Sequence, residues 1–266
     1  MEQVIGIRQS FRTLLVLLQR DQKDLLPSLF DSIINSTILF VFQGVQFLFL
    51  YPVLGMSQQM AASVFMGTFV FLFIEVAFTK SLALVYDLRF GRFIEYFMIL
   101  PLHRNWVLSF YVLSAVIRMI CNTLPMFLLA KLLLGNTFNI AGIHWIGLVS
   151  IYLLSMVFCA LLFFSVAFLA NFDWYMNSLW QQVLMPMQIF GGIFFTWSSI
   201  ATSFPVLHAL MRINPYTYML EGLRLSVLDF YQSSLSIGTC IIAMIIACAV
   251  GCLVLSEAAK RRLDMI

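Results

Sequence analysis

Two charged side chains fall within stretches that are otherwise apolar. Glu75 closes a stretch that carries no other charge after Asp31, and Arg118 is the one charge inside the apolar stretch 107–131, which ends at Lys131. A charged group near the middle of a bilayer costs at least about 2.5–3.5 kcal/mol, so such groups face protein or water and tend to be functional. We therefore interpret Glu75 and Arg118 as parts of a translocation path or as buried structural charges.

The partner of Arg118 is left open by the sequence. Counted from Trp106, Arg118 lies about 18 Å into the membrane, whereas Glu75 lies only about 8 Å deep when counted from Lys80. An ion pair with Glu75 is one alternative, although the two depths differ. A water-lined cavity is the second alternative, and a polar contact with another helix is the third, through Asn122, Ser36 or Gln43.

The segment 214–224, NPYTYMLEGLR, predicts a short helix. Asn214 suits the N-cap, and Pro215 suits the first helical position, where its missing N–H group is no loss. Glu221 and Arg224 are three residues apart and can pair on one face. We expect this pair to anchor the helix, whose motif also contains Tyr218.

Pro186 and the pair Gly191–Gly192 predict a bend in the apolar stretch 176–197. Proline removes a backbone hydrogen bond, and glycine offers little resistance to bending. The bend either belongs to the translocation path or is a static result of packing.

The segment 87–104, DLRFGRFIEYFMILPLHR, mixes charged and aromatic residues before it stops at Pro101. A short helix with one charged and one aromatic face suits docking into a groove on another protein. The alternative is a helix that rests on lipid headgroups. The residues that carry the docking hypothesis are Arg89, Arg92, Phe93, Glu95, Pro101 and Arg104.

The sequence gives little support for metal binding, catalysis or nucleic-acid binding. The three histidines stand on separate segments without a carboxylate at ligand spacing, so we expect no metal site. No G-x-x-x-x-G-K-[ST] loop, G-x-S-x-G or H-E-x-x-H motif occurs, so the chain is not expected to be an enzyme or to bind a cofactor itself. A net charge of +3 is too small to suggest nucleic acid. The five cysteines lie in apolar runs and fit packing roles.

The composition places all of these residues in a membrane protein. Of 266 residues, 62% are hydrophobic and 10% charged, and the mean hydropathy is +0.98. A spanning helix needs about 20 mostly apolar residues. We predict an all-α integral membrane protein with one transmembrane domain, 1–266, and six spans near 30–51, 60–80, 107–131, 145–170, 176–197 and 236–257.

Two further segments are expected to be helical without crossing. Residues 1–26 place apolar side chains near one helical face, which is typical of an amphipathic helix lying in the interface. Residues 198–235, with breakers at Pro205 and Pro215, predict short re-entrant helices. In the last span, small residues form one face that we expect to pack on another helix: Cys240, Ala243, Ala247, Cys248, Gly251 and Cys252.

The positive charges orient these spans. With the amino terminus inside, 11 of the 15 Lys and Arg residues fall on inner segments and three on outer ones, which predicts that both termini are cytoplasmic. Segment 81–106 is then the long cytoplasmic loop, and 198–235 lies on the opposite side.

Taken together, these features resemble the ABC type-2 permeases. The resemblance covers essentially the whole chain and depends on the six spans, on the loop with Glu95, Leu100 and Pro101, and on the NPYTYMLEGLR segment. It implies the membrane subunit of an exporter for glycans, lipids or drugs in a bacterial inner membrane. It also implies two permease copies and two ATP-binding subunits, which hold ATP and Mg and dock at segment 87–104 of the loop 81–106.

Two other classes of function remain open from the sequence. The chain could be a self-contained channel or secondary carrier that uses Arg118 and Glu75, or a membrane assembly factor without transport activity.

Overall fold

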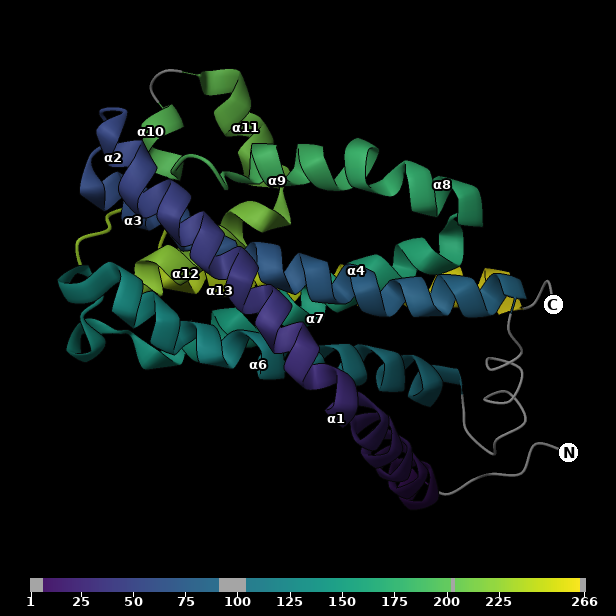
Figure 1. Ribbon diagram of the computed structural model, residues 1–266. Coiled ribbons are helices and arrows are strands. Elements are labelled where there is room, and N and C mark those ends of the chain that lie inside the picture. Colours follow the sequence, from purple (N-terminus) through teal and green to yellow (C-terminus); the bar gives the residue numbers. More distant parts are fainter. Residues whose placement is uncertain (1–6, 91–103, 202–203, 264–266) are drawn as a thin grey trace, which may run out of the picture.

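The computed structural model describes residues 7–90, 104–201 and 204–263, and in these ranges every regular element is a helix (Figure 1). Five helical stretches are long and apolar enough to cross a membrane. They correspond to five of the predicted spans. Their helices are α1 (Ile7–Val45), α4 (Gly67–Phe90), α6 (Arg104–Leu134), α7 (Trp145–Leu169) and α13 (Ile237–Leu263).

The centre of the bundle is α4, which packs against α1, α6 and α7. In the most apolar stretch of the second span, which contains α4, 83% of the residues are buried. The buried share in the corresponding stretch is 22% for the first span and 17% for the last. Aromatic rings fill the contact between α4 and α6, where Phe69 stacks on Phe127 with ring centroids 4.5 Å apart. The first and last spans therefore lie at the periphery and expose most of their apolar side chains.

The amino-terminal helix is not separate from the first span, contrary to the prediction of an independent interfacial helix over 1–26. α1 runs without a break from Ile7 to Val45 and contains Pro27. Leu14 and Leu18 are buried against Phe110 of α6. This packing holds the first turns in line with the span, and the free energy of burying these side chains offsets the bond lost at Pro27.

The predicted break between the first two spans is confirmed. α1 continues through a π-helical stretch, η1 (Gln46–Leu50), into α2 (Tyr51–Val53). Gly55 then adopts φ 93°, a left-handed conformation that glycine adopts readily. The Ser57 hydroxyl accepts a hydrogen bond from Met60 N and caps α3 (Gln58–Phe65), which leads into α4.

The loop predicted over 81–106 is largely helical where it is described. α4 extends to Phe90, and α6 begins at Arg104. Four residues of the docking hypothesis, Arg92, Phe93, Glu95 and Pro101, lie outside the described residues.

Short helical elements connect α6 to α13. After η2 (Gly135–Thr137) and η3 (Ile140–Gly142) comes α7, followed by α8 (Phe172–Asn177), the π-helical η4 (Trp180–Leu184) and α9 (Met185–Gly191). The elements α8, η4 and α9 follow one another along the length of the bundle (Figure 1). They coincide with the stretch predicted as the fifth span, but this stretch is not among the five helices that meet the criteria for a span.

The two glycines end this run instead of bending it. Gly192 is the C-cap of α9 with φ 89°, so the helix stops before residue 197. A Cβ on Gly191 would lie 2.6 Å from Cβ of Tyr216, so glycine allows α9 and α12 to touch. A π-helical turn precedes Pro186, which stands in the first turn of α9 and needs no helical N–H partner there.

Three short helices occupy the segment predicted to be re-entrant: α10 (Trp197–Ala201), α11 (Pro205–Ile213) and α12 (Pro215–Val227). The two breaker prolines begin α11 and α12. The Asn214 side chain accepts a hydrogen bond from Tyr216 N at 3.0 Å, which confirms the predicted helix start. Most residues of α12 are buried, so this helix lies inside the protein.

The small-residue face of α13 packs mainly on α7, as predicted. Cys240 and Cys248 are buried, and a Cβ on Gly251 would lie 3.2 Å from Leu161. Ile242, Ile246 and Leu253 are exposed on the opposite face, also as predicted. Cys252 is the exception, because it is exposed.

The ends of the long helices gather at two opposite ends of the bundle. The beginning of α1, the end of α4, the beginning of α6 and the end of α13 lie at one end of the bundle (Figure 1). The turns from α2 to α3 and from α6 to α7 lie at the other end, with α10 and α11.

Candidate functional site

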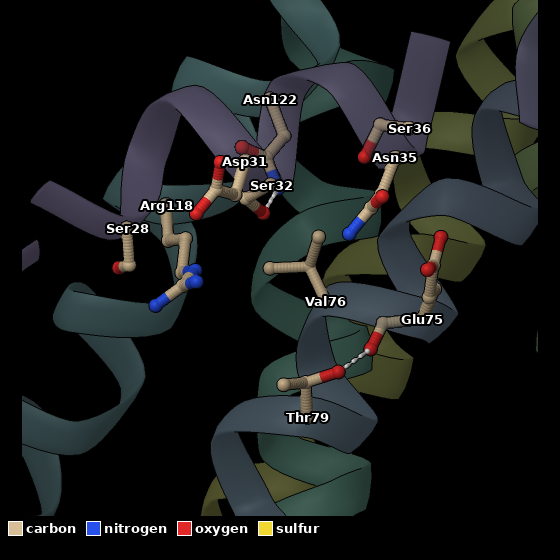
Figure 2. A pocket seen from close by; sticks show the side chains of 10 residues that line it. All are labelled: Ser28, Asp31, Ser32, Asn35, Ser36, Glu75, Val76, Thr79, Arg118 and Asn122. Atoms are coloured by element: carbon tan, nitrogen blue, oxygen red, sulfur yellow. Dashed lines mark hydrogen bonds between the residues drawn. The ribbon is translucent and has the colours of Figure 1, made fainter. Parts of the chain in front are cut away.

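A polar cavity lies between α1, α4 and α6 (Figure 2). Its volume is about 290 Å³. Nine of its ten lining residues are polar or charged, and Val76 is the exception. The lining comprises Ser28, Asp31, Ser32, Asn35, Ser36, Glu75, Val76, Thr79, Arg118 and Asn122. The structure thus brings the two charges singled out by the sequence, Glu75 and Arg118, to one cavity.

Glu75 and Arg118 do not form the ion pair that was the first alternative. Arg118 lies at one end of the cavity with Asp31 and Ser28, and Glu75 lies at the other end, with Val76 between them (Figure 2). Among the described residues, neither belongs to a salt bridge. The second alternative, a polar cavity, fits the structure, and the depth difference between the two residues explains their separation.

Two buried acceptor atoms in this cavity have no hydrogen-bond partner: Glu75 Oε2 and Asn122 Oδ1. The Asn122 side chain is fully buried, and its amide nitrogen donates to Ser32 Oγ at 2.7 Å. Buried acceptors usually have a partner, because an unsatisfied one keeps its desolvation cost. The cavity therefore has room and acceptors for groups that donate hydrogen bonds.

Helical spacing explains how α1 contributes to the lining. Ser28, Ser32, Asn35 and Ser36 recur at intervals of three and four residues, which places them on one face of the helix. Sequence reasoning considered Ser36 and Asn122 as contacts of Arg118 but missed Asp31, Asn35 and Thr79. The polar i, i+4, i+7 and i+8 pattern from Ser28 was the signal that could have found this face.

A partly buried polar contact lies beside the cavity and involves Asp21 of α1. Lys80 Nζ lies 3.4 Å from Asp21 Oδ1 and donates to Ser114 Oγ at 3.1 Å. Ser114 in turn donates to Asp21 Oδ2. This triad joins α1, α4 and α6, and sequence reasoning missed it because it counted Lys80 only as a charge at the membrane edge.

The second predicted pair, Glu221 and Arg224, is confirmed with a 3.0 Å contact. Both residues are completely buried. The Arg224 guanidinium also donates to four backbone carbonyls, those of Ser63, Gly192, Ile193 and Phe195. These bonds join α12 to the end of α3 and to the turn after α9.

Glu221 is equally well partnered. Its carboxylate accepts from Trp197 N at 3.2 Å and from the Tyr231 hydroxyl at 2.8 Å. Burial, and next the charge of Glu221, raise the pKa of Tyr231 well above its ordinary value. Tyr231 therefore remains a donor at physiological pH. Tyr218, which belongs to the same motif, donates to the backbone oxygen of Arg212.

Two residues of the docking hypothesis lie at helix ends. Arg89 is in the last turn of α4, where its guanidinium lies 5.2 Å from the ring centroid of Phe172 on α8. Arg104 is the first residue of α6.

A family model described as "ABC-2 type transporter" matches residues 12–228. The chain belongs to the ABC-2 type transporter family. It is therefore a transmembrane permease component, a type of subunit that is typically non-catalytic and normally works with an ATP-binding subunit. No curated protein and no solved structure matched the chain in the corresponding comparisons.

The ABC-2 match includes the polar cavity and the pair of Glu221 and Arg224, and it ends before Tyr231 and α13. The family resemblance predicted from the sequence is thus confirmed.

Proposed function

We propose that this permease is the membrane half of an ATP-driven exporter that moves an amphipathic or polymeric substrate, such as a glycan, lipid or drug, out of the cytoplasm. The polar cavity is the observation that carries this proposal. Glu75 and Arg118 stand on apolar spans, and the cavity gives both of them polar surroundings at membrane depth. Such intramembrane charges mark substrate pathways.

The directions of the helices support six crossings. α7 and α13 run in the same direction, so the chain has to return between them, and α8, η4 and α9 follow that path (Figure 1). At 1.5 Å per residue, the run from Phe172 to Gly191 is about 30 Å long, which matches the hydrocarbon core. Six crossings place both termini on the same side, which the distribution of Lys and Arg assigns to the cytoplasm.

In this arrangement α10, α11 and α12 form the re-entrant segment on the outer side. The buried bonds of Arg224 to the backbone of Ser63 and Gly192 support an anchoring role for this segment. Pro186 and the two glycines after it shape the helix that leads into this segment.

Two rigid helices connect the proposed docking segment to the cavity. Arg89 and Glu75 lie on α4, and Arg104 and Arg118 lie on α6. Each of these pairs is separated by about 21 Å at 1.5 Å per residue. A displacement of segment 81–106 by a closing ATP-binding subunit therefore changes the separation of α4 and α6 at the cavity.

The proposed complex contains two permease copies and two ATP-binding subunits, in a bacterial inner membrane. The test is purification of the chain from its native membrane, identification of the co-purifying subunits by mass spectrometry, and reconstitution into vesicles. Export that requires the ATP-binding subunit and ATP is the expected result. Flux through the permease alone would overturn the proposal and indicate a channel or carrier.

A further inference from the structure

We propose that the polar cavity binds the primary ammonium group of an amphiphilic amine, with Glu75 as its counter-ion. The proposal concerns a binding site. The idea that the amine is also the cargo rests on the proposed export function.

The charge of Glu75 is the first argument. Among the described residues, Glu75 forms no ion pair, although it lies in the middle of a membrane helix. The nearest basic residue along the chain, Lys80, is paired with Asp21, and Arg118 lies at the other end of the cavity (Figure 2). A carboxylate in a medium of low dielectric constant is stabilised strongly by a nearby cation.

The two acceptor atoms without hydrogen-bond partners indicate which kind of cation fits the cavity. Glu75 Oε2 and Asn122 Oδ1 are both buried and lack donors. A primary ammonium group carries a positive charge and three N–H donors, so it can neutralise Glu75 and donate to buried acceptors of the cavity. A quaternary ammonium group has the charge without donors, and an alcohol has a single donor without the charge.

The shape of the site indicates an amphiphile. A cavity of about 290 Å³ is at the lower limit for ligand pockets, so it admits a headgroup more readily than a whole drug-sized molecule. Asp31 and Asn35 of the lining are exposed, so the cavity opens beside α1. Next to them, Phe30 and Ile34 expose apolar surface that an alkyl chain can cover.

The first experiment compares three ligands on the unaltered full-length protein in phosphatidylcholine nanodiscs. The ligands are hexylamine, hexyltrimethylammonium and hexanol, and calorimetry measures their affinities. Hexylamine is expected to bind about tenfold tighter than the other two, because only it makes charge-assisted hydrogen bonds. Equal affinities of the three ligands would overturn the proposal.

The second experiment uses matched variants. Glu75→Gln is expected to weaken hexylamine binding about tenfold, whereas Glu257→Gln, on the exposed end of α13, is expected to leave it unchanged. Unchanged binding to Glu75→Gln overturns the proposal. Because the ligand comparison needs no substitution, a variant that fails to fold leaves the proposal testable.

The amine can belong to a lipid headgroup or to a free molecule. Phosphatidylethanolamine has a primary ammonium group, and phosphatidylcholine does not. Weaker hexylamine binding in phosphatidylethanolamine nanodiscs supports the site with a lipid as occupant, and equal binding in both lipids supports it with a free amine.

An export assay on the reconstituted transporter distinguishes amine binding from amine export. Amine binding without ATP-dependent export would contradict the proposed function and leave the binding site intact. Export of another substrate together with an absence of amine binding would contradict this inference alone.

Discussion

Arg224 Nη1 lies 3.0 Å from Glu221 Oε1, and the two side chains form a fully buried ion pair one turn apart on α12. Their remaining hydrogen-bonding groups are used by the backbone of three other segments and by Tyr231. A buried pair of this kind is costly to break, because the partner left behind is a buried, uncompensated charge.

Replacement of Arg224 by Met is therefore expected to lower the free energy of unfolding by about 3–5 kcal/mol. Titration with a denaturing detergent measures this quantity. The matched control is Arg261→Met, since Arg261 pairs with Glu257 on the exposed end of α13 and such pairs contribute about 1 kcal/mol or less. Similar losses in the two variants would show that the α12 pair does not anchor the fold.

Loss of the Tyr231 hydroxyl tests the hydrogen bonds that this residue donates to Glu221. Tyr231→Phe removes the donor that contacts both oxygens of Glu221, which should cost about 1–3 kcal/mol. Tyr86→Phe, at an exposed position, serves as the control.

This effect should depend on pH. The folded protein raises the pKa of Tyr231 above its ordinary value of 10.0, so the hydroxyl stabilises the fold fully at lower pH. Above about pH 10 the unfolded chain ionises first, and the stability advantage of the wild type over Tyr231→Phe declines. A difference that grew above pH 10 would contradict this assignment.

The contact between α9 and α12 requires a glycine. We expect Gly191→Ala to destabilise the protein by about 1–3 kcal/mol, because its Cβ would lie 2.6 Å from that of Tyr216. Gly238→Ala on α13 is the control, since the nearest atom to its added Cβ is a serine hydroxyl at 3.8 Å. Melting in detergent compares the two, and equal melting temperatures would mean that the helices can move apart freely.

The contact between Asp21 and Lys80 joins the first turns of α1 to the bundle. In a double-mutant cycle of Asp21→Asn and Lys80→Met, the coupling free energy should be about 1 kcal/mol. The same cycle on Glu257 and Arg261 should give about 0.3–0.5 kcal/mol, because that pair is solvent-exposed. If the Asp21 cycle gave no coupling, the start of α1 would not be held by this contact.

The docking hypothesis predicts uncoupling without loss of assembly. Arg92→Glu or Glu95→Ala should leave membrane insertion unchanged and reduce export per ATP hydrolysed, because both charges belong to the proposed contact with the ATP-binding subunit. Charge reversal is the stronger of the two changes, since one rim charge contributes about 1 kcal/mol or less. Arg261→Glu is the control, and normal export by both test variants would reject the docking assignment.

The features that the sequence determined are local along the chain. Apolar stretches long enough to cross a bilayer located five membrane helices, because the hydrocarbon thickness fixes the length that such a helix needs. The capping of α12 by Asn214 and the pairing of Glu221 with Arg224 depend on residues within one helical turn. The family was recognisable because the order of these local features was sufficient.

The tertiary structure decided which distant residues meet. Arg224 bonds to the backbone of Ser63, Lys80 meets Asp21, and Glu75 shares a cavity with Asp31 while remaining apart from Arg118. None of these relationships follows from spacing within one helix. They depend on the rotation and depth at which whole helices pack, and that packing is set by many weak side-chain contacts acting together.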